Sequence, residues 1–311
     1  MKINEIFGTE YPVFQGGMAN IATGEFAAAV SNAGAVGIIG SGGMDANTLR
    51  KHIRKAKSLT DRPFGVNLML MNPDTPDMAK VICEERVPLV TTGAGNPGVY
   101  VAAWKKAGTK VFPVVSSAAL ARRLARLGAD GLIAEGCESG GHVGEQTTLV
   151  LVPQVTEAVR DFGIPVVAAG GIATGSQMAA AFVLGASGVQ MGTAFLLAEE
   201  CPIHVNYKNA VVKAKDNCTM LTGRYSGHPV RALKNPLTRE YVKEESRGSD
   251  PMVLEKFMLG ALKRAVFDGD VKSGSLMAGQ VSGMIREIRP ARQILEQLMR
   301  EYEEIRTKGI P

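Results

Sequence analysis

Short apolar segments recur along much of the chain, and most of them end in glycine or in a small polar residue. Residues 118–127 and 174–184 lie between such segments and have the apolar spacing of amphipathic helices, and Thr174 can cap the second of them. Strand-like segments that alternate with helices predict repeated βα units. The eight segments that we interpret as strands are Val13–Gln15, Val36–Ile39, Phe64–Asn67, Leu89–Thr92, Lys110–Val115, Gly131–Ala134, Pro165–Ala168 and Gly188–Met191.

These strands are nearly continuous apolar runs, which is typical of a parallel sheet that helices cover. An open doubly wound sheet would leave its edge strands exposed, so eight units favour a closed barrel. We therefore predict an α/β fold, a (β/α)₈ TIM barrel, over residues 1–198. The pattern becomes richer in charge after Thr193, so we expect a lid or substrate-binding insertion over 199–251, after the eighth strand. Residues 252–311 should form C-terminal helices that pack on the barrel.

Composition and charge narrow the class of protein. The 311 residues are 45% hydrophobic and 21% charged, which indicates a globular protein with a sizeable core. The net charge of +5 fits a basic enzyme, or a surface that attracts an acidic partner. No compact Lys/Arg tract suggests nucleic acid binding, and no apolar run is long enough for a membrane span. The N-terminal residues lack the apolar core of a signal peptide, and four dispersed cysteines favour free thiols, so we expect a cytoplasmic protein.

Glycines gather where the predicted strands end, at the barrel mouth that holds the active site in TIM barrels. A single glycine there can simply make a tight turn, but the whole set favours a close approach of backbone to a flat or phosphorylated ligand. The loops after the seventh and eighth strands, where barrels commonly bind phosphate, offer the backbone amides of Gly170, Gly171, Gly192 and Thr193. Neither loop contains Lys or Arg, so amides and helix dipoles would bind the phosphate.

The glycine-rich loop EGCESGGHVG follows the sixth predicted strand and carries the main candidate for proton chemistry, His142. Glu135 ends the strand and should point at the ligand, whereas Glu138 would serve orientation or solvation. No second ligand cluster supports a metal site at these two acids, so we predict none. Among the other histidines, we expect His52 to be solvated.

Several segments together resemble the FMN-dependent enoyl-acyl carrier protein reductase II family, which is related to the nitronate monooxygenases. They are PVFQGGMAN, GVNLML, TTGAGNP, IAEGCESGGHVG, VVAAGGIATG, VQMGTAFL, GHPVRALKN and GSLMAGQVSG. The resemblance implies FMN as cofactor, NADH or NADPH as co-substrate, and an acyl carrier protein or another acyl thioester as partner. Glu135 stands where monooxygenases usually have Gln, and QGGM where they often have QGPM, so both differences favour the reductase. A carboxylate accepts hydrogen bonds only, whereas an amide also donates.

The resemblance also assigns roles to individual residues. His142 matches the active-site histidine of the family. The flavin ring should be bordered by Gly16, Gly17 and Met18, and it should form a hydrogen bond with Asn67. We predict the full cofactor-binding set to be Gly16, Gly17, Met18, Asn67, Glu135, Gly140, Gly170, Gly171, Gln190, Met191, Gly192 and Thr193.

The predicted reaction is the reduction of a trans-2-enoyl thioester in bacterial fatty acid synthesis. FMN would pass hydride from NAD(P)H to the β-carbon, and His142 would polarise the thioester carbonyl or supply the proton at the α-carbon. The alternatives are a nitronate monooxygenase that hands electrons to oxygen, a non-redox barrel enzyme for phosphosugars, and a flavin-binding protein without turnover. The choice between NADH and NADPH, the acyl-chain preference and the assembly, including a homodimer, stay open.

Overall fold

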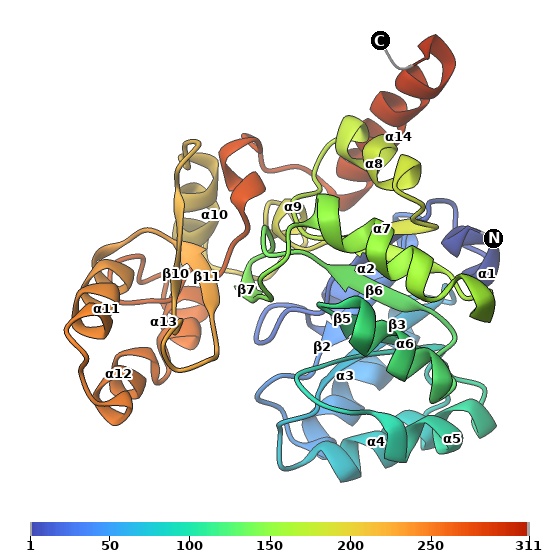
Figure 1. Cartoon of the computed structure of the whole chain (residues 1–311), viewed down its shortest axis with the longest axis horizontal. Helices are drawn as coiled ribbons and strands as arrows, with labels where there is room; N and C mark the ends of the chain where they lie inside the picture. Colours follow the sequence, from blue (N-terminus) through green and yellow to red (C-terminus); the bar gives the residue numbers. More distant parts are fainter. Residues whose placement is uncertain (1, 310–311) are drawn as a thin grey trace.

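A computed structural model describes residues 2–309 and shows a barrel beside a smaller lobe (Figure 1). Eight strands form one parallel sheet in the order β1-β9-β8-β6-β5-β4-β3-β2. These strands are β1 (Val13–Gln15), β2 (Gly37–Gly40), β3 (Phe64–Met69), β4 (Leu89–Gly93), β5 (Lys110–Val115), β6 (Leu132–Glu135), β8 (Val166–Ala169) and β9 (Gly188–Met191). Each predicted strand is therefore present, with bounds that differ by at most two residues at either end.

The sheet closes on itself between β1 and β2, where the backbone pairing is short. A single parallel bridge joins Phe14 to Val36. The buried side chain of Gln15 extends this seam, because its Oε1 accepts a hydrogen bond from the backbone N–H of Ile38 at 3.0 Å. The closure confirms the predicted (β/α)₈ TIM barrel and excludes the open sheet.

Helices cover the outside of the barrel and begin where the sequence offers caps. Thr174 caps α8 as predicted, with its hydroxyl accepting from the Gln177 N–H, and Ser117 caps α6 in the same way. The helices of this layer are α2 (Gly24–Asn32), α3 (Ala46–Leu59), α4 (Thr75–Glu84), α5 (Gly98–Lys106), α6 (Ala118–Arg126), α7 (Thr148–Ala158), α8 (Gly175–Val183) and α14 (Ala291–Lys308). Short turns of helix add α9 (Thr193–Leu196), η1 (Arg160–Phe162) and η2 (Gln280–Gly283).

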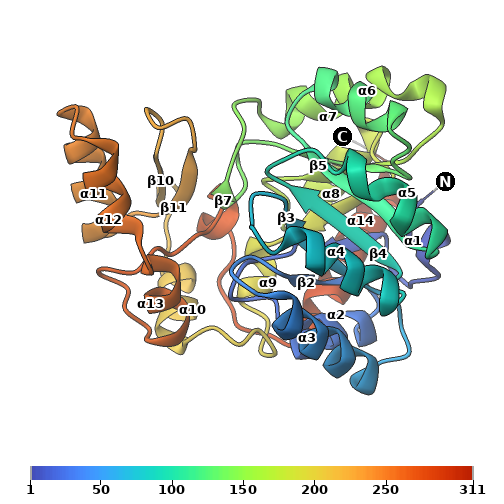
Figure 2. The ribbon, with the colours of Figure 1, turned by 90° about the horizontal axis from the view of Figure 1, so that it is seen from below.

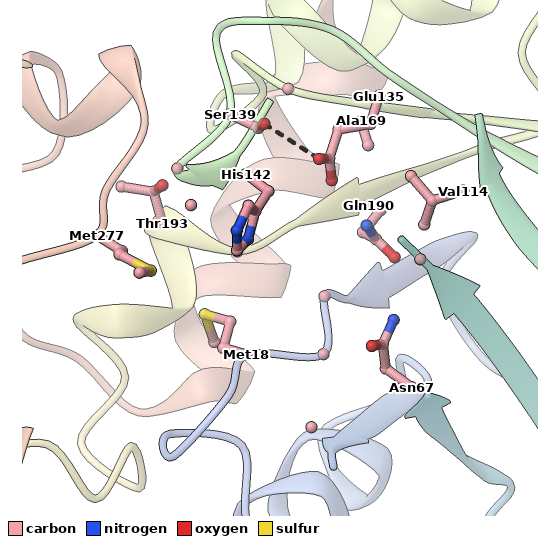
Figure 3. A pocket seen from close by; sticks show the side chains of 18 of the residues that line it. Met18, Asn67, Val114, Glu135, Ser139, His142, Ala169, Gln190, Thr193 and Met277 are labelled. Atoms are coloured by element: carbon pink, nitrogen blue, oxygen red, sulfur yellow. Dashed lines mark hydrogen bonds between the residues drawn. The ribbon is translucent and has the colours of Figure 1, made fainter. Parts of the chain in front are cut away.

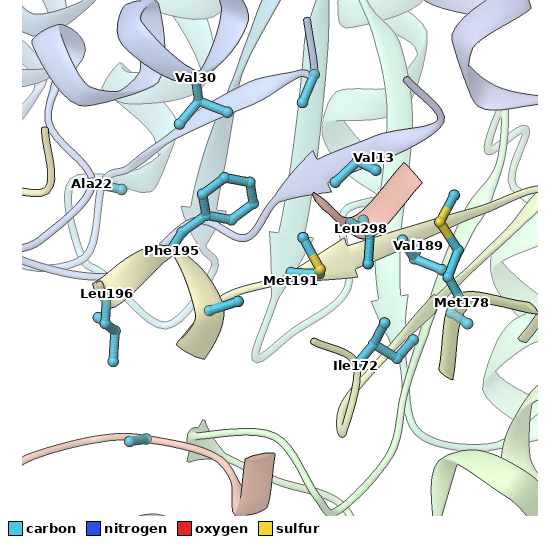
Figure 4. Close-up of a cluster of buried hydrophobic side chains, with 14 of the residues drawn as sticks. Val13, Ala22, Val30, Ile172, Met178, Val189, Met191, Phe195, Leu196 and Leu298 are labelled. Atoms are coloured by element: carbon cyan, nitrogen blue, oxygen red, sulfur yellow. The ribbon is translucent and has the colours of Figure 1, made fainter. Parts of the chain in front are cut away.

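Apolar side chains close the barrel at the N-terminal ends of its strands, whereas the end formed by the carboxyl ends of the strands is open. Helix α1 (Ile3–Phe7) seals the N-terminal ends of the strands, where the rings of Phe7, Phe14 and Phe112 lie 5.6–5.8 Å apart. A larger cluster fills the space between the barrel wall and its helices, with Phe195 fully buried in it (Figure 4). The carboxyl ends of the strands are thus the end that is available for a ligand.

The smaller lobe projects from this open end (Figures 1 and 2). It contains α10 (Val205–Val212), β10 (Thr219–Thr222), β11 (Val230–Leu233), α11 (Pro236–Ser246), α12 (Pro251–Met258) and α13 (Ala261–Phe267). The boundary expected at residue 252 falls inside the lobe, because Tyr241 of α11 packs edge-to-face on Phe257 of α12 at 6.5 Å. Of the expected C-terminal helices, α14 packs on the barrel, where Tyr302 contacts Phe182 of α8 at 5.2 Å.

A two-residue strand, β7 (Gly141–His142), links the two parts of the molecule. It belongs to the loop after β6, yet it pairs with β11 of the lobe in a three-stranded sheet of order β10-β11-β7.

Within the described residues, no helix is long and apolar enough to cross a membrane.

Candidate functional site

A cavity of about 300 Å³ opens at the carboxyl ends of the barrel strands, a volume at the lower end of the range for small-molecule sites. All the predicted site residues line it, from Gly16 on the first strand to Thr193 after the last and His142 on β7. The sequence prediction missed the wall that Leu262, Met277 and Val281 supply from the far C-terminal part of the chain. The motif GSLMAGQVSG contains Met277 and Val281, and its glycines were the available signal.

Two side-chain amides point into the cavity from two different strands (Figure 3). Asn67 on β3 donates from Nδ2 to the Thr91 hydroxyl at 3.0 Å, which leaves its Oδ1 as an acceptor. Gln190 on β9 is buried, and its amide makes no hydrogen bond to any residue between 2 and 309. Because this side-chain amide lines the cavity and is unpaired, it can both donate to and accept from a ligand with several polar ring atoms.

The loop after β8 presents backbone rather than side chains. Gly170 and Gly171 have φ angles of +94° and +71°, a region that side chains other than glycine rarely adopt. The Gly171 N–H has no acceptor among the described residues. At the neighbouring loop, Thr193 Oγ1 accepts from the Gly279 N–H at 2.9 Å, so the hydroxyl hydrogen of Thr193 can donate to a ligand. This arrangement of donors suits a phosphate group.

Glu138 supports this loop. Its carboxylate accepts from the backbone N–H and the hydroxyl of Thr148, each at 3.0 Å, and so caps α7. The Thr148 hydroxyl also lies 2.9 Å from the carbonyl of Gly170. Glu138 therefore has the orienting role that the sequence suggested. The described residues contain no cluster of three His, Cys, Asp or Glu side chains arranged to hold a metal.

Glu135 ends β6 and faces the cavity from the wall opposite Asn67 (Figure 3). Its only side-chain hydrogen bond within the described residues is from the Ser139 hydroxyl, at 3.2 Å. Burial raises the pKa of Glu135 to about 7, and the bond from Ser139 opposes that rise only in part. None of the Lys or Arg residues in the described part of the chain lines the cavity. Near neutral pH the carboxyl is thus partly protonated and can donate a hydrogen bond, as the amide of Gln would.

His142 lines the cavity, as do Met18 and Met277 (Figure 3). Its backbone pairs with Val230 of β11, so the lobe supports it. Burial, and to a smaller extent the charge of His228, lowers the pKa of His142. The lowered pKa favours the neutral imidazole, which can donate from one ring nitrogen and accept at the other. His52 is not simply solvated as expected, because its Nδ1 accepts from the Gly24 N–H at 3.1 Å.

The closed barrel, with polar groups converging at its mouth, belongs to the class of (β/α)₈-barrel proteins that bind small ligands at the carboxyl ends of the strands. The family model described as nitronate monooxygenase matches residues 1–85 and 77–301. The chain therefore belongs to the nitronate monooxygenase family and is an oxidoreductase.

Individual relatives carry different names. The structure of FabK from Thermotoga maritima has 49% identity, a TM-score of 0.95, and covers 98% of this chain and 97% of its own. Nitroalkane oxidase from Streptomyces ansochromogenes has 29% identity and a TM-score of 0.87, with 98% and 99% covered. A (3aS,4S,5R,7aS)-5-hydroxy-7a-methyl-1-oxo-octahydro-1H-indene-4-carboxyl-CoA dehydrogenase of Mycobacterium tuberculosis is 31% identical over 96% of this chain and 94% of its length. A probable nitronate monooxygenase of Staphylococcus saprophyticus is 29% identical over 98% of both.

Proposed function

We propose that the protein is an FMN-dependent enoyl-acyl carrier protein reductase that uses NADH or NADPH. The observation that carries the proposal is a single cavity, without Lys or Arg from residues 2–309, that is lined by Gly171 with its free N–H, by Thr193 with its hydroxyl donor and by His142. The 49% identity with FabK, against 29% for the nitronate monooxygenase and nitroalkane oxidase relatives, favours the reductase branch. The carboxyl-CoA dehydrogenase relative, by its name, acts on a CoA thioester, which supports a thioester substrate.

The residues of the cavity fit FMN in their chemistry. The free donors at Gly171 and Thr193 would hold its phosphate, and the amides of Asn67 and Gln190 would bond to the edge of its ring. When bound, FMN would supply the two-electron chemistry that connects NAD(P)H with the thioester. His142 would donate an N–H hydrogen bond to the thioester carbonyl and so stabilise the charge that develops on its oxygen. The apolar side chains of Leu262, Met277 and Val281 would exclude water from the acyl chain.

Nitronate monooxygenase is the second candidate, because the family model and the Staphylococcus saprophyticus relative carry that name. One experiment separates the two activities: anaerobic oxidation of NADH or NADPH with crotonyl-CoA, run beside aerobic turnover of an alkyl nitronate. We expect rapid anaerobic oxidation that depends on the thioester. Turnover of the nitronate alone would overturn the reductase proposal. An acyl carrier protein as partner and a cytoplasmic location belong to the same proposal.

A further inference from the structure

Strand β11 holds two cavity-lining segments that are far apart in sequence. One edge of β11 pairs with β10. The other edge pairs with β7, through Val230 with His142 and Arg231 with Gly141, and also forms a bridge from Ala232 to Met277. The lobe, through this single strand, therefore determines where His142 lies relative to the barrel.

The side chain of Arg231 adds a second connection to the same loop. Its Nε donates to the carbonyl of Cys137 at 2.9 Å, and one terminal nitrogen donates to the Thr219 hydroxyl at 3.0 Å. Arg231 is 7% exposed and forms no ion pair with any residue between 2 and 309. Burying a guanidinium without a carboxylate partner is costly, so these hydrogen bonds compensate for much of its desolvation. Arg231 thus binds the loop at Cys137 with its side chain and at Gly141 with its backbone.

We propose that Arg231 is a positioning residue that fixes His142 in the cavity by holding the loop between Cys137 and Gly141 against β11. The role of His142 toward an enoyl thioester rests on the proposed function, but the placement of its imidazole does not. Small displacements of a reacting group can reduce a rate about 10²-fold. Arg231 therefore acts on the reaction through His142, without touching the ligand.

Arg231→Met keeps the length of the side chain and removes its donors, so the Cys137 carbonyl loses its partner. In the holoenzyme we expect the rate with crotonyl-CoA to fall about 10–100-fold, with KM changed much less. Flavin content and the rate of flavin reduction by NAD(P)H should stay close to those of the wild type. Arg231→Lys can restore one donor and should recover part of the rate. Arg239→Met is the matched control, because Arg239 is an exposed arginine of the same lobe.

A readout that does not depend on turnover is the titration of His142, followed by NMR of the imidazole signals of the holoenzyme. The chain has four histidines, so His142→Gln assigns the signal. Burial lowers the pKa of His142, and release of the loop in Arg231→Met should raise it toward its ordinary value of about 6.5. Arg239→Met should leave the pKa of His142 unchanged.

An unshifted His142 titration in Arg231→Met would overturn the proposal. If Arg231→Met does not fold, the same titration in Arg231→Lys decides, with a smaller rise expected. A wild-type protein inactive on thioesters would refute the proposed function and leave this test valid.

Discussion

The two sides of the cavity are built in different ways. On the barrel side, Gly16, Gly171 and Thr193 each lie within two residues of the end of the preceding strand, so local sequence sets their positions. On the lobe side, His142 and Met277 are held by β11, a strand distant from both in sequence. The comparison indicates that cofactor binding depends on local turns, whereas the placement of the proton-handling group depends on long-range pairing. Variants on the two sides should therefore separate flavin binding from turnover.

The largest effect is expected on the barrel side, from Gly171→Asp. The new side chain would meet Glu138, whose Cβ lies 3.2 Å from the position of the added Cβ, and would bring a second negative charge to the donors proposed for phosphate. The positive φ of +71° adds backbone strain. We expect the purified protein to lose its flavin absorbance.

Gly163→Asp is the matched control for this variant. Gly163 also has a positive φ, +62°, but an added Cβ there meets nothing within 4 Å and lies at the opposite end of the barrel. Its strain should be similar, and its flavin content should equal that of the wild type. Full flavin occupancy in Gly171→Asp would show that the phosphate binds elsewhere.

On the lobe side, His142→Ala should slow turnover of an enoyl thioester by about 10²–10⁴-fold, the usual contribution of a proton-handling or polarising group. Bound flavin and its reduction by NAD(P)H should persist, because the barrel side is intact. Rapid-mixing measurements of the two half-reactions would test this separation. Near-normal turnover would make His142 a structural residue of β7.

The same difference explains what could be predicted from sequence. The strands and the glycine-rich mouths are local patterns, so the sequence predicts the barrel and the glycines on the barrel side of the cavity, but not the wall of Leu262, Met277 and Val281. The pairing of β7 with β11 has no local signal, because the segment Gly141–His142 contains only two residues and its partner begins at Val230. The packing of α12 on α11, where Tyr241 contacts Phe257, also has no local signal, because the apolar face of a helix does not identify the element that it packs against.

Glu135 offers a pH-dependent test of the barrel side. Burial raises its pKa from 4.5 to about 7, so the folded carboxyl retains a proton that the unfolded chain has lost. Stability should therefore fall as pH rises from 4.5 to about 7, by up to about 3 kcal/mol, and stay low above that range. Glu135→Gln has no carboxyl to ionise, so this loss of stability should be absent from the variant.

Thermal unfolding of the flavin-free proteins measures the effect. At about pH 8, Glu135→Gln should unfold a few °C above the wild type, and most of the difference should disappear near pH 5. Glu145→Gln, which removes an exposed carboxyl from the same loop, should show no such trend. A constant difference across this range would contradict the raised pKa.

The smallest effect is expected at the lobe surface, where an acidic acyl carrier protein could dock. Two basic residues of the lobe cannot contact a docked carrier protein, because they are buried. They are Lys208, which donates to the carbonyl of Ala198 at 2.6 Å, and Arg231. Lys213 and Lys215 are exposed beside η2, whose Val281 lines the cavity. Reversing both to Glu should raise KM for a carrier-bound substrate several-fold and leave crotonyl-CoA turnover nearly unchanged at high salt, because exposed charges act mainly on encounter.

Salt provides the second arm of this test. Raising the ionic strength from about 0.05 to 0.5 M shortens the Debye length severalfold, so the wild-type KM for the carrier-bound substrate should rise toward that of the double variant. Lys51→Glu with Lys55→Glu changes the charge equally on α3, in the outer helical layer of the barrel, and should leave that KM unchanged. If both pairs act alike, net charge and not a docking surface governs the encounter. An effect of the lobe pair alone that salt abolishes would place the carrier protein at the lobe, next to the strand that holds His142.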